Sequence, residues 1–165
     1  MYSGFDLNPK SYLREYRDYN PLMRTKFPVT VHLLFFRDNR ILLLRRFNTG
    51  FEDGNYSVPA GHLDGDETVR MAAQREALEE IGVHIEIEEI YFASVMHRRS
   101  DDERVDFFVH VKKWQGGPYN AEPNKCDELR WYDLDELPEN TIPYVRKAIR
   151  NYLDGISFEE FGWVG

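Results

Sequence analysis

Three glutamates with the spacing of a metal site stand close together near the middle of the chain. Glu76, Glu79 and Glu80 fall within five consecutive positions directly after Arg75. Like charges three or four residues apart on a helix repel each other, at a cost of about 0.2–0.5 kcal/mol per pair. Carboxylate oxygens gathered on a rigid surface are also what a small divalent cation such as Mg²⁺ requires. The cluster therefore predicts a metal site that binds phosphate oxygens and makes a water molecule more acidic.

A helix over residues 68–81 would position these carboxylates. Thr68 suits its start and Gly82 its end. At about 100° per residue the three glutamates share one arc of roughly a quarter turn. The apolar residues on the opposite side are expected to face the core: Met71, Leu78 and Ile81. A glutamate-rich fragment such as REALEE is by itself typical of a solvated helix face, so the wider pattern has to decide.

The rest of the chain predicts strands around this helix. The apolar runs VTVHLLFF and ILLLRR are separated by RDNR, which suits a tight hairpin turn. A short strand at YSVP precedes the helix, and VHIEIEEIYFASVM, ERVDFFVHVKKW and LRWYD predict strands after it. A last helix is predicted from Pro143 to Gly155. Strands flanking a central helix, with another helix near the end, indicate one α/β domain around a mixed sheet.

Composition narrows the class of protein. The chain has 165 residues and a net charge of −8, with scattered lysines and arginines, which argues against binding to a nucleic-acid polymer or a membrane surface. Cys126 is the single cysteine, so an intrachain disulfide is excluded. No apolar segment resembles a signal peptide or a membrane span. We expect a cytoplasmic protein of one domain over residues 1–165, with an extension at 1–24, a core at 25–155 and an aromatic tail at 156–165.

Residues 61–83 resemble the Nudix box, G-x5-E-x7-R-E-U-x-E-E-x-G-U, in which U is apolar. The segment GHLDGDETVRMAAQREALEEIGV matches every fixed position, and Ala77 occupies the first apolar slot. The resemblance extends over roughly residues 29–152. It implies a Nudix-type α/β/α sandwich around a mixed β-sheet and an enzyme that uses Mg²⁺ or Mn²⁺ to hydrolyse phosphoric anhydride bonds of nucleotides.

The resemblance also implies roles for residues within the box. Glu76, Glu79 and Glu80 are expected to bind the metal, and Glu76, Glu80 and Arg75 to serve catalysis. The general base that activates water is either Glu76 or a glutamate from a distant loop. Arg75 and Glu67 would hold the site together, with Glu67 and Gly61 supporting the residues that contact the metal.

Outside the box the resemblance implies further site residues. MutT-type enzymes end the preceding strand in Pro-Gly-Gly, where a glycine carbonyl binds metal; here Ala60 takes that place. Glu122 is the best match to their loop glutamate that binds metal. Arg46 resembles an arginine that contacts substrate phosphate. Asn140 and Tyr144 lie in the segment that reads the base in similar enzymes, although a turn asparagine and a core tyrosine are the commoner roles of these residue types.

Subfamily marks favour a MutT-like activity, the cleavage of a (deoxy)nucleoside triphosphate to a monophosphate and pyrophosphate. No proline lies between Val83 and Gly117, where ADP-ribose hydrolases often have one. Hydrolysis of another nucleoside diphosphate derivative, such as ADP-ribose or a dinucleoside polyphosphate, is the alternative, and a non-catalytic nucleotide sensor is a second one. An isopentenyl diphosphate isomerase ranks last, because Cys126 is in the wrong neighbourhood. The identity of the base and a homodimer are left open.

Overall fold

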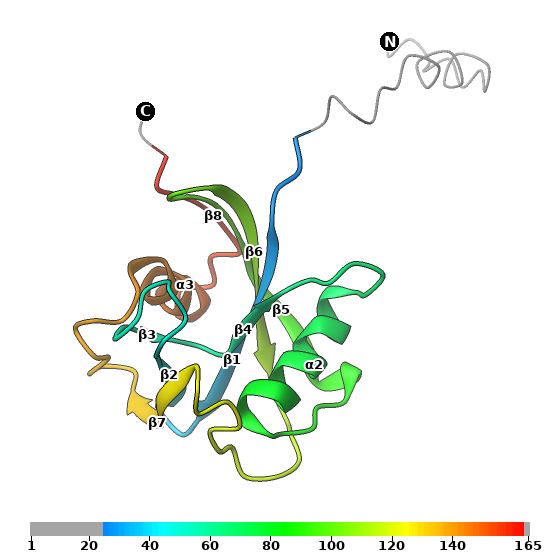
Figure 1. Cartoon of the computed structure of the whole chain (residues 1–165), viewed down its shortest axis with the longest axis vertical. Helices are drawn as coiled ribbons and strands as arrows, with labels where there is room; N and C mark the ends of the chain where they lie inside the picture. The colour runs from blue at the N-terminus through cyan, green and yellow to red at the C-terminus, as the bar shows by residue number, and fades with distance from the viewer. Residues whose placement is uncertain (1–24, 164–165) are drawn as a thin grey trace, which may run out of the picture.

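The part of the chain that the structure describes forms an eight-stranded mixed sheet with one α-helix on each face (Figure 1). The computed structural model describes residues 25–163, so the predicted extension at 1–24 lies outside the described residues. The elements are β1 (Val29–Arg37), β2 (Arg40–Arg46), β3 (Tyr56–Ser57), β4 (Ala60–His62), α2 (Val69–Ile81), a 3-10 turn η3 (Ile87–Glu89), β5 (Ile90–Arg99), β6 (Glu103–Val111), β7 (Cys126–Asp133), α3 (Pro143–Leu153) and β8 (Phe158–Phe161).

Strand β1 is the centre of the sheet. The strand order is β3-β2-β1-β6-β5-β8, with β4 also paired to β1 and β7 to β2. Strand β1 runs parallel to β6 over seven residue pairs and antiparallel to β4, in which Thr30 faces His62 and His32 faces Ala60. The predicted hairpin turn between β1 and β2 is confirmed, with Asp38 at a φ of 48°.

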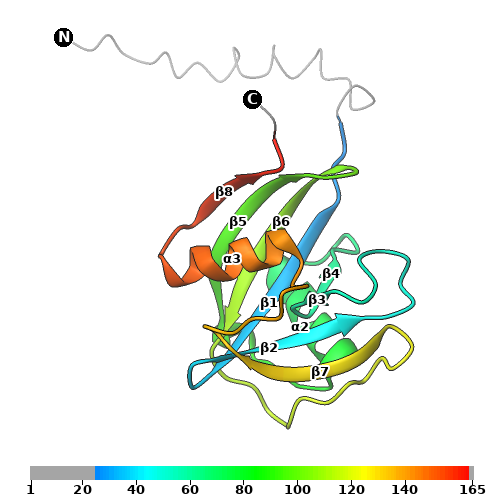
Figure 2. The ribbon, with the colours of Figure 1, turned by 90° about the vertical axis from the view of Figure 1, so that its left-hand side faces the viewer.

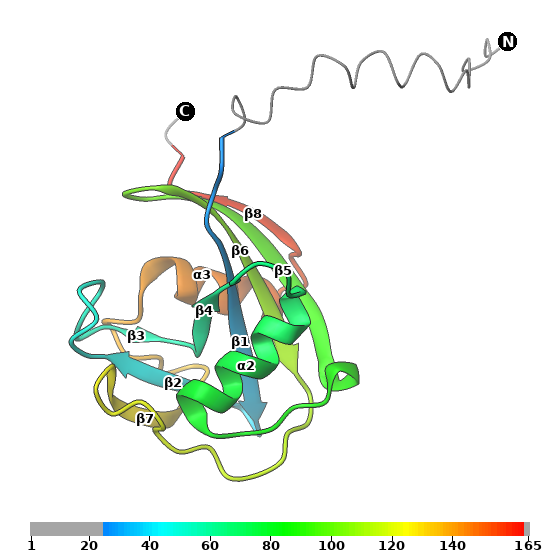
Figure 3. The same cartoon turned by 45° about the vertical axis from the view of Figure 1, so that its right-hand side comes forward.

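The two helices cover opposite faces of this sheet. In Figure 2, α3 crosses one face of the sheet, and in Figure 3, α2 lies against the other. Alternation along β1 sends Val31, Leu33 and Phe35 into the core beneath α2. Leu34 belongs to the second core, beneath α3. The predicted α/β/α sandwich around a mixed sheet is therefore confirmed.

Helix α2 has the predicted ends but not the predicted buried face. Thr68 caps its start by accepting a hydrogen bond from the Met71 amide, and Gly82 ends it in the left-handed conformation with a φ of 66°. The prediction that Met71 and Leu78 face the core is wrong, since their exposed fractions are 44% and 46%. Ile81 is buried as expected. The helix packs on the sheet through small residues and one acid: Ala72, Ala73, Ala77 and Glu76.

The segment at residues 83–96 differs from the prediction, whereas the aromatic tail agrees with it. The long strand predicted over VHIEIEEIYFASVM is wrong in its first half, because β5 begins only at Ile90 and η3 precedes it. The aromatic tail packs on the body as predicted. Its strand β8 pairs in parallel with β5, and the Trp163 Nε1–H donates to the His97 carbonyl. No helix of the described residues is long and apolar enough to cross a membrane.

Candidate active site

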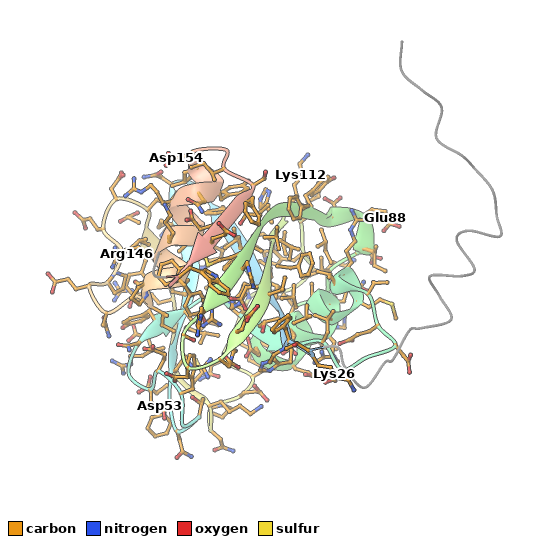
Figure 4. All side chains as sticks on the ribbon, turned by 90° about the horizontal axis from the view of Figure 1, so that it is seen from above. Lys26, Asp53, Glu88, Lys112, Arg146 and Asp154 are labelled. Carbon is orange, nitrogen blue, oxygen red and sulfur yellow. The ribbon has the colours of Figure 1, made fainter. Side chains whose placement is uncertain are left out.

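A cavity of about 420 Å³ opens where β4, the inner face of α2, the loop after β2 and the loop before β7 meet. Its far wall is formed by β1, β5 and α3, so segments distant in sequence share one space. Exposed charged side chains such as Asp53, Glu88, Lys112 and Asp154 project outward from the body, seen from above in Figure 4. The cavity instead collects the acidic residues predicted for the site.

All three glutamates of the acidic cluster line this cavity, together with Glu122 from the loop before β7. Burial raises the pKa of Glu76, and the negative charges of Glu79 and Glu122 add to that effect while Arg75 opposes it. Burial likewise raises the pKa of Glu80 to about 8, with added repulsion from Glu76 and Glu122. The four carboxylates are therefore close enough to repel one another. The cavity thus brings together the four side chains that are expected to bind metal.

Arg75 ties the acidic helix to the segment before it. Its Nη2 donates to Glu67 Oε1 at 2.8 Å and to the His62 carbonyl at 3.0 Å, and its Nη1 donates to Glu76 Oε1 at 2.6 Å. A longer contact of 3.3 Å joins Nη1 to Glu79 Oε2. Glu67 also accepts from the Asp64 amide. Arg75 and Glu67 thus fix the orientation of the carboxylates, as the sequence predicted.

Strand β4 packs its backbone directly against the glutamates. The Ala60 amide donates to Glu80 Oε2 at 2.9 Å, and Ala60 is not among the residues with a positive φ. A Cβ added to Gly61 would lie 1.8 Å from Glu76 Oε1, so a side chain at this position would displace the Glu76 carboxylate. Glycine at position 61 therefore lets β4 lie against Glu76 in its present orientation.

Besides Arg75, the cationic side chains of Lys125 and Arg46 line the cavity near the carboxylates. Lys125 Nζ lies 2.7 Å from Glu122 Oε1. Arg46 donates from Nε to the Phe51 carbonyl at 2.7 Å and from Nη2 to Thr49 Oγ1 at 3.0 Å, which anchors it to the loop after β2. Arg45, one residue earlier, points to the other face and pairs with Asp127. Arg46, for which the sequence analysis expects a phosphate contact, thus lines the cavity, and so does Lys125, which the sequence analysis did not name.

Of the two residues expected to read a base, only one reaches the cavity. Tyr144 lines it from the first turn of α3, and its ring lies over the Arg98 guanidinium at 4.0 Å. Asn140 is exposed and donates from Nδ2 to the Gly54 carbonyl at 2.7 Å. The structure therefore does not bring Asn140 to the cavity; the residue connects two loops instead.

Two side chains of the far wall, His32 and Arg98, contact a buried carboxylate that the sequence analysis did not assign to the site. Asp106, fully buried, accepts from Arg98 Nε at 2.6 Å and pairs with His32 Nε2 at 3.3 Å. A carboxylate within the apolar run VDFFVHV was the available signal. Arg98 is eight positions away, but His32 is 74 positions away, so the pattern could not reveal that pairing. Thr30 and Arg104 also line the cavity without having been singled out.

The carboxylates present fit a hard divalent cation. Their oxygens are the preferred ligands of such ions, and their mutual repulsion would be relieved by a positive charge. Among the described residues, no group of three or more acidic, histidine or cysteine side chains is arranged so that it could hold a metal ion by itself. An open set of this kind suits an ion that keeps several waters and is completed by substrate phosphates, as Mg²⁺ usually is.

The fold and the glutamate cluster together define a Nudix enzyme. The family model described as the NUDIX domain matches residues 26–152, and the chain belongs to the Nudix hydrolase family. Enzymes of this family generally use divalent metal ions and act on nucleotide substrates. The β8 tail lies beyond the matched region.

Individual relatives carry different activities in their names. The chain is 29% identical over 125 residues to an ADP-ribose pyrophosphatase of Methanocaldococcus jannaschii, covering 76% of this chain and 72% of that one. It is 25% identical over 130 residues to the 8-oxo-dGTP diphosphatase of Escherichia coli, covering 76% and 98%. A crystal structure of a MutT NUDIX hydrolase from Burkholderia pseudomallei superposes with a TM-score of 0.71 and 28% identity, covering 76% of this chain and 98% of that one.

Proposed function

We propose that this protein is a Mg²⁺- or Mn²⁺-dependent pyrophosphohydrolase that cleaves a (deoxy)nucleoside triphosphate to a monophosphate and pyrophosphate. The observation that carries the proposal is the placement of four carboxylates and two cations, Arg46 and Lys125, around one end of a single cavity. Likeness to the 8-oxo-dGTP diphosphatase and to the MutT structure supports it. We further propose that one domain carries the whole activity.

The residues take the following parts in this proposal. Glu76, Glu79, Glu80 and Glu122, with the Ala60 carbonyl, would hold the metal. The bound ion would neutralise phosphate charge and make a water ligand more acidic. Arg75 and Glu67 fix the glutamate rotamers through the contacts described above, and Gly61 leaves room for them.

The proposed reaction is hydrolysis of a phosphoric anhydride bond, in which water attacks one of the two phosphorus atoms joined by a bridging oxygen. A water oxygen forms a bond to the α- or the β-phosphorus, the bond from that phosphorus to the oxygen bridging the two breaks, and the other product, pyrophosphate or the monophosphate respectively, leaves with that oxygen. The proton of the water passes to Glu76 or to Glu122, the two carboxylates that fit the role of general base. Arg46 and Lys125 bind the phosphate oxygens, and Tyr144 contributes to the binding of the nucleoside.

A second candidate substrate is a nucleoside diphosphate derivative. The name of the Methanocaldococcus jannaschii relative, an ADP-ribose pyrophosphatase, favours it. The same carboxylates would then act on a diphosphate that joins two groups. A nucleotide panel with Mg²⁺, followed by phosphorus NMR of products formed in ¹⁸O-labelled water, separates the two. Monophosphate plus pyrophosphate supports the triphosphate proposal, and turnover of ADP-ribose alone contradicts it.

Glu80→Gln tests the role of the acidic cluster. We expect kcat to fall at least about 100-fold, because a neutral amide is a poor ligand for Mg²⁺. We also expect the metal-free protein to become more stable to heat. The introduced amide keeps an oxygen for the Ala60 N–H and is neutral at every pH, whereas Glu80, with its pKa raised to about 8, must take up a proton or be buried as a charge when the chain folds. Steady-state kinetics and thermal unfolding measure both effects.

Glu88→Gln is the matched control, because Glu88 is exposed and lies outside the cavity. This variant should keep the activity of the parent enzyme. Full activity of Glu80→Gln, or hydrolysis that persists after divalent metals are removed with a chelator, would overturn the proposed function.

A further inference from the structure

Strand β8 lies next to a residue of the cavity wall, although it follows the residues that the family model matches. It borders β5 beside α3 (Figure 2). In the parallel register of the two strands, Phe158 is paired with Val95 and Phe161 with Arg98. Arg98 lines the cavity. The last residue of β8 is therefore the sheet neighbour of a cavity residue.

The side chains of β8 alternate between the two faces of the sheet. Glu159 and Phe161 are half-buried, whereas Phe158 and Glu160 are exposed. Phe161 packs against the core beneath α3, and Glu159 bonds to that helix. One face of β8 is thus turned toward α3 and the other toward solvent.

Glu159 ties β8 to two turns of α3. Its Oε2 accepts from Asn151 Nδ2 at 3.0 Å and lies 3.2 Å from Lys147 Nζ. The Ile156 amide also donates to the Asn151 carbonyl at 2.8 Å. Lys147 and Asn151 follow Tyr144 by three and seven positions, which places all three on one face of the helix. The face of α3 that carries Tyr144 is therefore the face that β8 holds.

Phe161 contacts Tyr144 itself. The two ring centroids are 6.5 Å apart at an interplanar angle of 69°. Edge-on aromatic pairs are favourable at centroid separations of about 4.5–7 Å. The Tyr144 ring also lies over the Arg98 guanidinium at 4.0 Å. Tyr144 thus contacts both members of the β5–β8 pair formed by Arg98 and Phe161.

The residues after Phe161 fix the end of β8 on β5. Gly162 has a φ of 79°, and a Cβ there would lie 2.0 Å from the Arg99 carbonyl oxygen, so only glycine fits without a backbone shift. The Trp163 Nε1–H donates to the His97 carbonyl at 3.1 Å, and the two rings lie 4.6 Å apart. These contacts hold Phe161 in its place on the sheet.

We propose that Phe161 is a positioning residue for the nucleotide substrate, acting through Tyr144. By packing against the Tyr144 ring, it keeps that ring against Arg98 in the cavity wall. Phe161 does not itself line the cavity that the described residues form, so its effect on binding passes through its neighbours. The inference rests on the proposed function, in which Tyr144 contributes to the binding of the nucleoside. It adds β8 to the segments that shape the site.

The position of Phe161 predicts an effect on binding and not on the chemical step. Tyr144 reaches the cavity from α3, whereas the glutamates reach it from α2 and from the loop before β7. Helices α2 and α3 cover opposite faces of the sheet, and Phe161 packs on the α3 face. Loss of its ring should therefore loosen the nucleoside end of the site and leave the metal end unchanged.

Phe161→Ala tests this effect in the full chain with Mg²⁺. We expect KM for dGTP, and for any other triphosphate that the parent enzyme hydrolyses, to rise roughly five- to tenfold, with kcat within about twofold of the parent. Phe161→Tyr keeps the ring and should restore the parent KM. Phe158→Ala is the matched control, because Phe158 belongs to the same strand but is 58% exposed on the other face. Its KM should equal that of the parent.

A double-mutant cycle tests whether Phe161 acts through Tyr144. Tyr144→Leu alone should raise KM. In that background Phe161→Ala should raise KM no further, whereas two independent effects would multiply. The inference is overturned if the effects multiply, or if Phe161→Ala lowers thermal stability and leaves KM unchanged.

A binding measurement separates this inference from the proposed function if no triphosphate is hydrolysed. The full chain labelled with 3-fluorotyrosine gives a ¹⁹F signal for Tyr144, assigned by its loss in Tyr144→Phe, which we follow during titration with dGMP and with ADP-ribose. The signal should shift with at least one of them, and half-saturation should need roughly five to ten times more of it in Phe161→Ala, but not in Phe158→Ala. No shift with either compound, or equal half-saturation in Phe161→Ala and the parent, overturns the inference.

Discussion

At the scale of single residues, Gly61 shows how little space separates the backbone from the chemistry. A methyl group at this position would overlap the carboxylate of Glu76, which is itself held by Arg75. The neighbouring atoms are the end of a side chain, so the protein can yield by moving Glu76 and not by unfolding. Substitution here should therefore affect activity more than stability.

Gly61→Ala is expected to lower kcat roughly 100-fold, because a small displacement of a metal-binding group disrupts positioning. The free energy of unfolding should fall by only about 1 kcal/mol, the typical effect of a point substitution. Kinetics at saturating Mg²⁺ and urea unfolding give the two values. Gly117→Ala is the control, since a Cβ there meets no atom within 4 Å. Equal activity of both variants would contradict the close-approach argument.

Residue types at fixed spacing made the glutamates of α2 predictable, but not the residues on the far wall of the cavity. Glu76, Glu79 and Glu80 lie on one helix, so their shared face follows from helix geometry alone. His32 and Asp106 are 74 positions apart and meet only through the parallel pairing of β1 with β6. An isolated chain segment contains no signal for such a partner. From the sequence alone, His32 is expected to be a satisfied strand histidine, whereas one of its nitrogens has no partner.

At the scale of elements, α2 shows why the apolar residues misled the prediction of its buried face. Helix α2 turns Glu76 toward the cavity. The buried face of the helix that contains Glu76 also contains alanines. Small side chains let the helix approach the sheet closely, which brings the carboxylates against β4. Met71 and Leu78 are displaced to the surface as a result. Cavity geometry here outweighs the usual hydrophobic pattern.

Substitutions on the two faces of α2 should therefore have unequal effects. Ala77→Leu is expected to lower the free energy of unfolding by about 1–3 kcal/mol, because Ala77 is fully buried and the core has no room for the added carbons. Leu78→Ala should change it by only about 0.5 kcal/mol, as for other surface positions. Urea unfolding of both variants measures the difference. A larger loss for Leu78→Ala would restore the original prediction.

At the scale of the whole molecule, the buried Asp106 joins β1, β6 and β5 through His32 and Arg98. Its folded pKa of about 2 lies below the ordinary value of 3.8, so it contributes stability that is complete above pH 4. That contribution is lost as the pH falls toward 2. It amounts to about 2 kcal/mol, since one pKa unit corresponds to about 1.4 kcal/mol.

Asp106→Asn should therefore be less stable than the parent at pH 5, and the gap should narrow toward pH 2. Thermal unfolding midpoints at several pH values between 5 and 2 measure that gap. Other carboxylates titrate in the same range, but they do so in both proteins and largely cancel in the difference. A gap that stays constant with pH would show that Asp106 does not support the fold as an ion.

Strands β1 and β6 pair in one register over seven residue pairs, and this register decides which side chains of β1 face α2. A slip of one position would reverse every side chain of β1, placing Val31 and Leu33 where Thr30 and His32 now stand. Polar groups would then be forced under α2 and apolar ones into the cavity. Correct assembly of the core and correct assembly of the cavity wall thus depend on the same strand register, so a chain that forms one also forms the other.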